Sequence, residues 1–157
     1  MDKNPVEALV ERLKARAITL ATAESCTGGL LGKLITDVPG SSAVYPGGVI
    51  SYCSRVKHEI LGVDQNDLDT LGPVSATVAQ QMAENARRVV GADLGVGITG
   101  IAGPNSDGTG RPVGLVFLAA SDGQLTLVRE RRFDGDRAAV REQAAEAAAE
   151  LAMELLA

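Results

Sequence analysis

The octet Thr22-Ala23-Glu24-Ser25-Cys26-Thr27-Gly28-Gly29 decides how the rest of this chain is interpreted. Residues 17–21 before it form an apolar run that suits a buried strand, and residues 30–35 after it favour a helix. Ser25 is therefore predicted at a strand-to-helix corner, where free backbone N–H groups and the positive end of the helix dipole stabilise an oxyanion or a phosphate. The same position also suits an N-cap serine, so the octet alone leaves capping and catalysis open.

Composition narrows the class of protein. The chain has 157 residues, 45% of them hydrophobic, but only two Phe, two Tyr and no Trp, so Ala, Val, Leu and Ile must fill its core. A formal charge of −5 argues against a broad nucleic-acid footprint, which needs clustered Lys and Arg. Two cysteines provide neither a disulfide framework nor a four-ligand zinc site. We expect a cytoplasmic α/β protein with reduced thiols, no metal, and no signal peptide or membrane span.

Helical and strand patterns alternate along the chain. Apolar spacing predicts helices over residues 5–14, 30–35 and 55–61, from Ser75 onward with Val78, Met82, Ala86 and Val89 inward, and from about Asp136 onward with Val140, Ala144, Ala147, Leu151 and Leu155 inward. Strands are predicted over residues 17–21, 47–53, 94–99, 113–120 and 125–131, the last two joined by a tight turn. This order predicts one domain over residues 1–157. Its fold class is a three-layer α/β/α sandwich with a mixed, mostly parallel sheet and one antiparallel hairpin.

The fold places the candidate ligand site. Ligands of such sheets bind beyond the carboxyl ends of the strands. That rule brings together the corner at Ser25, the strand end at Tyr52 and the loop over residues 99–104.

Three motif matches compete for the chemistry. Gly95, Gly97 and Gly100 fit the spacing of a dinucleotide fingerprint, but they lie within a strand and no helix follows. The segment 54–57 matches the Ser-x-x-Lys of penicillin-recognising enzymes, yet the chain lacks the Lys-Thr-Gly and Ser-Asp-Asn that complete that set. Cys26 and the single histidine, His58, can form a thiol nucleophile and its base, although His58 is expected on a helix surface.

A family resemblance joins these pieces. The octet, the segments 52–57 and 59–63, Pro73-Val74-Ser75, Gly97-Ile98-Thr99-Gly100-Ile101-Ala102-Gly103-Pro104, Pro112-Val113-Gly114 and Gly135-Asp136-Arg137 occur in an order that resembles the CinA C-terminal domain family, the PncC-type nicotinamide mononucleotide deamidases. The resemblance covers the chain from about Val6 to Leu156. It implies the stand-alone form, without the N-terminal nucleotide-hydrolysing domain of full-length CinA proteins.

The resemblance implies hydrolysis of the carboxamide of nicotinamide mononucleotide to nicotinic acid mononucleotide and ammonia, with no cofactor and no metal. It assigns Ser25 as the nucleophile and Lys57 and Tyr52 as its activating partners. Lys57 can take the serine proton only when neutral, so burial or a neighbouring cation such as Arg55 has to lower its pKa toward 7 from about 10.4. Tyr52 is expected to relay the proton or to hold the lysine.

The remaining expectations concern substrate and partners. The implied substrate-binding residues are Glu24, Cys26, Thr27, Gly28, Gly29, Gly47, Gly48, Thr99, Gly100, Gly103 and Arg137, the last of these holding the 5′-phosphate beside a helix N-terminus. Two positions depart from the family pattern, Ser54 where Asn is common and Ala76 where Glu often stands.

We expect a small-molecule mononucleotide as partner, and neither nucleic acid nor a membrane. We also expect the chain to form a homo-oligomer through its Ala-rich last helix, with a dimer as the favoured form. A catalytically inactive nucleotide-binding module and a competence or DNA-damage accessory protein are the alternatives.

Overall fold

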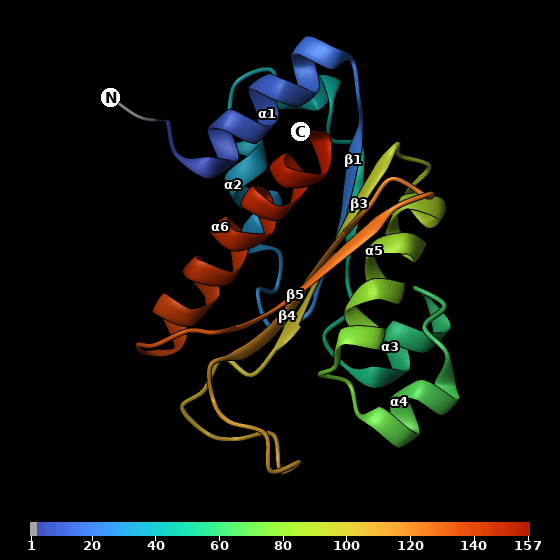
Figure 1. Ribbon diagram of the computed structural model, residues 1–157, viewed down its shortest axis with the longest axis vertical. Helices are drawn as coiled ribbons and strands as arrows, with labels where there is room; N and C mark the ends of the chain where they lie inside the picture. The colour runs from blue at the N-terminus through green and yellow to red at the C-terminus, as the bar shows by residue number, and fades with distance from the viewer. Residues whose placement is uncertain (1–2) are drawn as a thin grey trace.

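The computed structural model describes residues 3–157 and places a mixed sheet at the centre of the molecule (Figure 1). The sheet has the order β2-β1-β3-β4-β5. Its strands are β1 (Leu20–Glu24), β2 (Gly47–Ile50), β3 (Leu94–Gly100), β4 (Leu115–Ser121) and β5 (Thr126–Arg132).

Strand directions follow from the pairings. β1 pairs in parallel with both β2 and β3, whereas β4 is antiparallel to both β3 and β5. Only β4 therefore runs against the others among the described strands. The β4–β5 hairpin closes at the pair Ser121 and Thr126. The predicted mixed, mostly parallel sheet with one antiparallel hairpin is confirmed.

Helices cover both faces of the sheet (Figure 1). One face carries α1 (Pro5–Arg16), α2 (Leu30–Thr36) and α6 (Arg137–Leu156). The other carries α5 (Ala76–Val90), with α3 (Ser54–Glu59) and α4 (Gln65–Leu71) beside it, and a short 3-10 turn (Ser41–Ala43) precedes β2. This arrangement is the predicted three-layer α/β/α sandwich. None of the helices in the described part of the chain is long and apolar enough to cross a bilayer.

Two glycines of β3 explain how closely α5 packs on the sheet. A Cβ on Gly95 would lie 2.0 Å from the carbonyl oxygen of Ala83, and one on Gly97 would lie 2.6 Å from that of Ala79. A side chain at either position would push α5 away from the strand. The glycine spacing that resembles a dinucleotide fingerprint therefore serves helix–sheet packing.

Several predicted boundaries are wrong. β1 begins at Leu20 rather than Ala17, because Ala17 is the left-handed cap of α1 (φ 53°), and it runs through Glu24. β2 ends at Ile50 rather than Cys53. The helix α4 has no predicted counterpart, since its residues are mostly polar and form no apolar stripe.

Some residues predicted to be inward are not buried. Val89 is 50% exposed, and Ala147 and Leu155 are only half-buried. The buried face of α6 instead includes Ala145, Ala148, Ala149, Ala152 and Leu156.

Candidate active site

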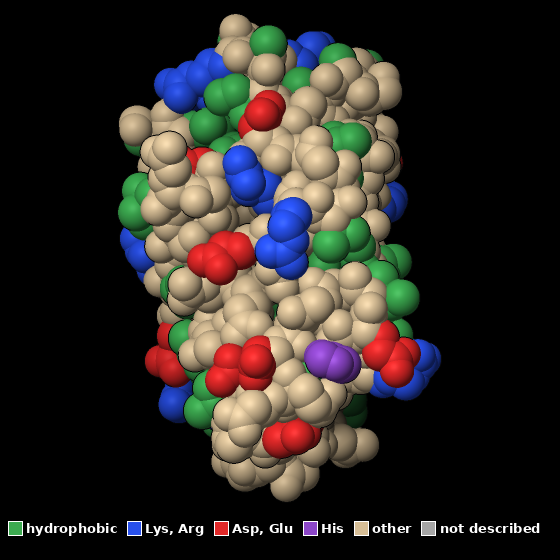
Figure 2. All heavy atoms as spheres, turned by 90° about the vertical axis from the view of Figure 1, so that its right-hand side faces the viewer, with side chains coloured by type: hydrophobic (Ala, Val, Ile, Leu, Met, Phe, Trp, Pro, Cys, Tyr) green, Lys and Arg blue, Asp and Glu red, His purple; other side chains and the backbone are tan. Residues whose placement is uncertain are grey.

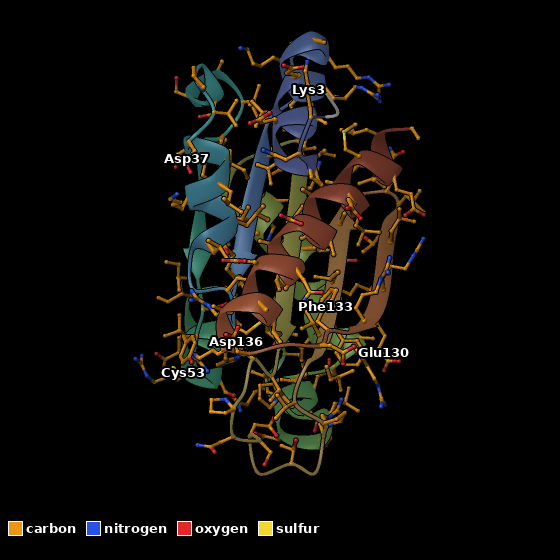
Figure 3. All side chains as sticks on the ribbon, turned by 90° about the vertical axis from the view of Figure 1, so that its left-hand side faces the viewer. Lys3, Asp37, Cys53, Glu130, Phe133 and Asp136 are labelled. Atoms are coloured by element: carbon orange, nitrogen blue, oxygen red, sulfur yellow. The ribbon has the colours of Figure 1, made fainter. Side chains whose placement is uncertain are left out.

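A pocket of about 260 Å³ opens where β1 and β3 end. This is near the lower end of the range for small-molecule sites, about 300–1,000 Å³. Figure 3 shows Cys53 at the start of α3 and Asp136 at the start of α6 toward the same end of the molecule. The pocket is lined by Ser25, Cys26, Tyr52, Cys53, Ser54, Lys57, Pro73, Val74, Thr99, Gly100, Ala102, Asp107 and Arg137.

Ser25 and Lys57 lie in contact at the inner end of this pocket. Lys57 lies in the last turn of the short helix α3 and points inward, and the residue is only 1% exposed. Its Nζ lies 2.8 Å from Ser25 Oγ, 2.8 Å from the carbonyl oxygen of Ser51 and 3.4 Å from that of Tyr52. A neutral Nζ can donate to the two carbonyls and accept the Ser25 hydroxyl proton, whereas the ammonium can donate to all three oxygens, so the site suits both protonation states of the lysine.

Burial lowers the pKa of Lys57 from 10.5 to about 8, because the surrounding protein solvates an ammonium poorly. The thiols of Cys26 and Cys53 act in the opposite direction and raise it. Of the two expected causes, burial lowers this pKa, whereas Arg55 makes an exposed ion pair with Glu59 at 2.9 Å and is not among the causes of the shift. Desolvation alone therefore supplies the lowered pKa.

The backbone holds Ser25 at the end of β1. Its N–H donates to the carbonyl oxygen of Ile98 on β3 (3.0 Å), and its own carbonyl accepts from Gly28 N–H (3.0 Å). Ser25 is 7% exposed, so its hydroxyl faces the pocket from a buried position. Within residues 3–157, the N–H groups of Cys26 and Thr27 donate to no backbone carbonyl, and the Cys26 N–H lies near its own thiol. These two groups are free to bind an anion formed next to Ser25.

Glu24 does not line the pocket, although a substrate contact is expected from the family resemblance. Its carboxylate accepts hydrogen bonds from Leu31 N–H (2.9 Å) and Gly32 N–H (3.0 Å), at the start of α2. Glu24 thus satisfies donors that a helix N-terminus leaves free. Because the Glu24 carboxylate occupies the N-terminus of α2, a substrate anion cannot bind there. The candidate anion site is instead the turn directly after Ser25.

Tyr52 contributes two different groups. Its carbonyl oxygen lies 3.4 Å from Lys57 Nζ and 3.5 Å from Ser25 Oγ, whereas its side chain is 60% exposed. The Tyr52 hydroxyl accepts a hydrogen bond from Arg137 (3.0 Å), which also donates to the carbonyl oxygen of Gly103 (2.7 Å). The backbone of Tyr52 therefore holds the lysine, while its hydroxyl lies with Arg137 rather than on a proton-relay path.

Thr99 and Gly100 line the pocket at the end of β3. The Thr99 hydroxyl donates to the carbonyl oxygen of Pro73 (2.7 Å), so its free lone pairs, not its proton, face a ligand. Gly100 has no room for a side chain, because a Cβ would lie 2.7 Å from the carbonyl oxygen of Leu115. Gly103 takes part through the carbonyl that Arg137 binds.

Seven of the implied substrate-binding residues do not line the pocket: Glu24, Thr27, Gly28, Gly29, Gly47, Gly48 and Gly103. Gly28 and Gly29 have left-handed backbone angles (φ 57° and 101°) that let the turn reach α2. A Cβ on Gly48 would lie 2.2 Å from Thr22 Oγ1, so that glycine is needed for packing of β2 on β1. Gly47 has no protein atom near its missing side chain and contacts nothing in the pocket.

The alternative Cys–His pair is not assembled. Cys26 is buried, and burial raises the pKa of its thiol to about 11. His58 is exposed on α3, whereas Lys57 next to it is buried, and the His58 Nδ1 lies 2.8 Å from the carbonyl oxygen of Val63. Cys26 is therefore protonated near neutral pH and has no histidine base.

Four residues of this region were missed from the sequence. Ser51 supplies a carbonyl to Lys57, Cys53 and Asp107 line the pocket, and Arg141 of α6 binds the carbonyl oxygens that follow Ser25. A carbonyl ligand leaves no side-chain signal. Arg141 lies one helical turn after Arg137, a spacing that would have placed both on one face of α6.

A larger groove, about 460 Å³, lies between α1 and α2. Its lining includes the carboxylates of Glu7, Glu11, Asp37 and Glu146 but no Ser, Thr or Cys nucleophile. The smaller pocket at Ser25 is therefore the candidate active site.

Comparison with known proteins assigns the family. A family model described as the CinA C-terminal domain matches residues 2–156. This chain belongs to the CinA C-terminal domain family. The family resemblance predicted from the ordered motifs is confirmed.

Individual CinA relatives agree with this assignment. A CinA-like protein from Geobacter sulfurreducens is 47% identical over 139 residues, which is 88% of this chain and 34% of the relative. The solved structure of a competence/damage inducible protein from Agrobacterium tumefaciens is 36% identical, with a TM-score of 0.91, and covers 100% of this chain and 99% of that chain. A competence damage-inducible protein from Klebsiella pneumoniae is 32% identical, with a TM-score of 0.92 and 98% coverage of both chains. This chain spans about a third of the length of the curated CinA relatives that it matches.

Proposed function

We propose that this CinA-family chain is a nicotinamide mononucleotide deamidase, an amidohydrolase that uses Ser25 as its nucleophile and Lys57 as its general base and acid. The observation that carries the proposal is the 2.8 Å contact between Lys57 Nζ and Ser25 Oγ at the inner end of the pocket. A lysine with a pKa of about 8 is partly neutral near physiological pH, so it can accept the serine proton.

In the first half of the reaction, Ser25 Oγ attacks the carboxamide carbon while its proton moves to Lys57 Nζ. The carbonyl oxygen of the substrate becomes an oxyanion, which the N–H groups of Cys26 and Thr27 bind. Each such donor contributes about 3 kcal/mol to transition-state stabilisation. The Lys57 ammonium then protonates the amide nitrogen, the C–N bond breaks, and ammonia leaves an ester on Ser25.

In the second half, water replaces ammonia. Neutral Lys57 takes a proton from this water as its oxygen attacks the ester carbon. The second tetrahedral intermediate expels Ser25 Oγ, which takes its proton back from Lys57. The product is nicotinic acid mononucleotide, and both residues return to their starting protonation states.

Charges at the pocket rim suit a mononucleotide. Arg137 stands at the first position of α6, so its guanidinium and the N-terminal end of that 20-residue helix face the same region. In the free protein, the Arg137 guanidinium donates to the Tyr52 hydroxyl and to the Gly103 carbonyl. A 5′-phosphate bound there would accept these hydrogen bonds in their place. The carboxylate of Asp107 lines the same pocket, which suits a cationic pyridinium ring.

The alternative function, a competence or DNA-damage accessory protein, has less support. Figure 2 shows basic and acidic side chains scattered over the face with α5, not a continuous basic band. The net charge of −5 points the same way. The competence and damage names belong to the relatives, and they identify no ligand.

Product analysis tests the proposed activity. The purified chain is incubated with nicotinamide mononucleotide in isotopically labelled water, and ammonia and nicotinic acid mononucleotide are measured together. We expect equimolar release, with one labelled oxygen in the new carboxylate. Saturable binding of the mononucleotide without ammonia would instead support the inactive nucleotide-binding module.

A further inference from the structure

Arg141 reaches from α6 to the turn that follows Ser25. Its Nε lies 3.1 Å from the carbonyl oxygen of Cys26, and its Nη2 lies 2.8 Å from that of Thr27. The Nη2 atom would also lie 3.5 Å from a Cβ on Gly28, so the guanidinium lies directly against this turn. Arg141 is half-buried and does not line the pocket, so it acts on the turn and not on a ligand.

These two bonds fix the direction of consecutive peptide groups. A trans peptide is planar, and its C=O points opposite to the N–H of the next residue. With the Cys26 carbonyl held by Arg141, the N–H of Thr27 points away from the guanidinium. Holding the Thr27 carbonyl likewise directs the N–H of Gly28, which donates to the carbonyl oxygen of Ser25 (3.0 Å).

The Ser25 carbonyl in turn fixes the N–H of Cys26. Its bond to Gly28 orients the peptide group between Ser25 and Cys26, which carries that N–H. Arg141 therefore helps to fix two successive peptide groups, those that carry the Cys26 and Thr27 carbonyls. The Thr27 carbonyl also accepts from Leu30 N–H (3.0 Å), and the backbone bond from Gly28 fixes the third group. Among the described residues, the N–H groups of Cys26, Thr27 and Gly29 in this turn donate to no backbone carbonyl, and those of Cys26 and Thr27 follow Ser25 directly in the chain.

The charge of Arg141 acts on the turn, where it also works to lower the pKa of the Cys26 thiol against the larger effect of burial. Within the described residues, Arg141 makes no ion pair with a carboxylate, and its recorded contacts are the two carbonyls of the turn. The planar fork of a guanidinium can bind two adjacent carbonyls at once, which the single ammonium of a lysine does poorly.

We infer that Arg141 is a positioning residue, which holds the turn after Ser25 so that the N–H groups of Cys26 and Thr27 receive the oxyanion. This inference rests on the proposed function for the identity of the anion. The positioning itself rests only on the contacts of Arg141.

Kinetics and exchange of the whole chain test the inference together. Arg141→Ala and Arg141→Lys are compared with the wild type, and Arg129→Ala is the matched control. Arg129 also contacts α6, through Glu154, but lies on β5 away from the turn. We expect kcat for nicotinamide mononucleotide to fall by about 100-fold in both Arg141 variants, as a displacement of catalytic groups by about 1 Å does. KM should change little, because Arg141 does not touch the substrate.

Two further readouts separate positioning from a general loss of structure. Added guanidinium ion should partly restore kcat in Arg141→Ala and leave Ser25→Ala unchanged. Amide hydrogen exchange should rise in the peptide over residues 25–30 of Arg141→Ala, and not in that of Arg129→Ala. A rise in KM with unchanged kcat, or unchanged exchange over residues 25–30, would overturn the inference.

The proposed function and this inference fail in distinguishable ways. A wild-type chain that releases no ammonia contradicts the deamidase proposal, and exchange over residues 25–30 then decides alone whether Arg141 orders the turn. An active wild type with unaffected Arg141 variants contradicts only the role of Arg141.

Discussion

Lys57 Nζ lies 2.8 Å from Ser25 Oγ, although the two residues are 32 positions apart and belong to different elements. Ser25 directly follows the interior strand β1, and Lys57 comes from the short helix α3 that follows the edge strand β2. No carboxylate of residues 3–157 is among the groups that shift the pKa of the buried Lys57 amine. Burying an unpaired amine costs stability, and an apolar side chain would fill the same space without that cost, so the lysine is explained better by catalysis than by packing.

The rate should depend on pH through Lys57. A base works only when neutral, so kcat/KM is expected to rise with pH and to level off above the lysine pKa of about 8. Lys57→Met should lower kcat/KM by about 100- to 10,000-fold, the usual contribution of general acid–base catalysis, and should lose this pH dependence. A wild-type rate that stays constant over a range of roughly pH 6 to 10, which spans this pKa, would contradict the assignment of Lys57 as the base.

The stability of the fold should also depend on pH through Lys57. The pKa of Lys57 is about 8 when folded and about 10.4 when unfolded, so the unfolded state binds more protons between these values. The free energy of unfolding of the wild type therefore gains a contribution as pH rises through this window, and Lys57→Met lacks it. Denaturant unfolding of both proteins at several pH values measures the difference. A gap between them that does not change with pH would show that Lys57 is not buried as a shifted amine.

Arg137 should determine preference for the phosphorylated substrate. Removing a charged hydrogen bond to phosphate costs about 1.5–3 kcal/mol, so Arg137→Ala should lower kcat/KM for nicotinamide mononucleotide by about 10- to 100-fold. Nicotinamide riboside has no phosphate, and its kcat/KM should hardly change. Equal losses on both substrates would mean that Arg137 acts on the pocket shape through Tyr52 and not on the phosphate.

The two thiols should differ in reactivity. Cys53 is exposed at the start of α3, where the N–H groups of Val56 and Arg55 lower its thiol pKa, whereas burial raises the pKa of Cys26 to about 11. Iodoacetamide should therefore alkylate Cys53 and spare Cys26, as peptide mass mapping can show. Cys26→Ser should keep the wild-type rate of ammonia release. Loss of that rate, or alkylation of Cys26 in the folded protein, would revive the thiol nucleophile.

The sequence predicted the layers, the hairpin and the family because these depend on apolar spacing and on motifs that are local in the chain. It also named Ser25, Lys57, Thr99, Gly100 and Arg137, which the fold brings to one pocket. Contacts made by backbone carbonyls were not predictable, which is why Ser51 was missed.

Motif residues that hold the backbone look the same in sequence as residues that bind a ligand. Glu24 is within the octet because it satisfies the start of α2, and Gly48 is fixed by packing against Thr22. The sequence also could not show whether burial or the charge of Arg55 lowers the pKa of Lys57, because burial is a property of the folded chain.

Ammonia release from nicotinamide mononucleotide by the wild type, Ser25→Ala and Lys57→Met, measured above the lysine pKa of about 8, tests the central claim most directly. The account predicts steady release by the wild type and a loss of at least about 1,000-fold in Ser25→Ala, because an oxyanion site without its nucleophile leaves only residual catalysis. Circular dichroism should show that both variants fold. Equal release by all three proteins would contradict the account.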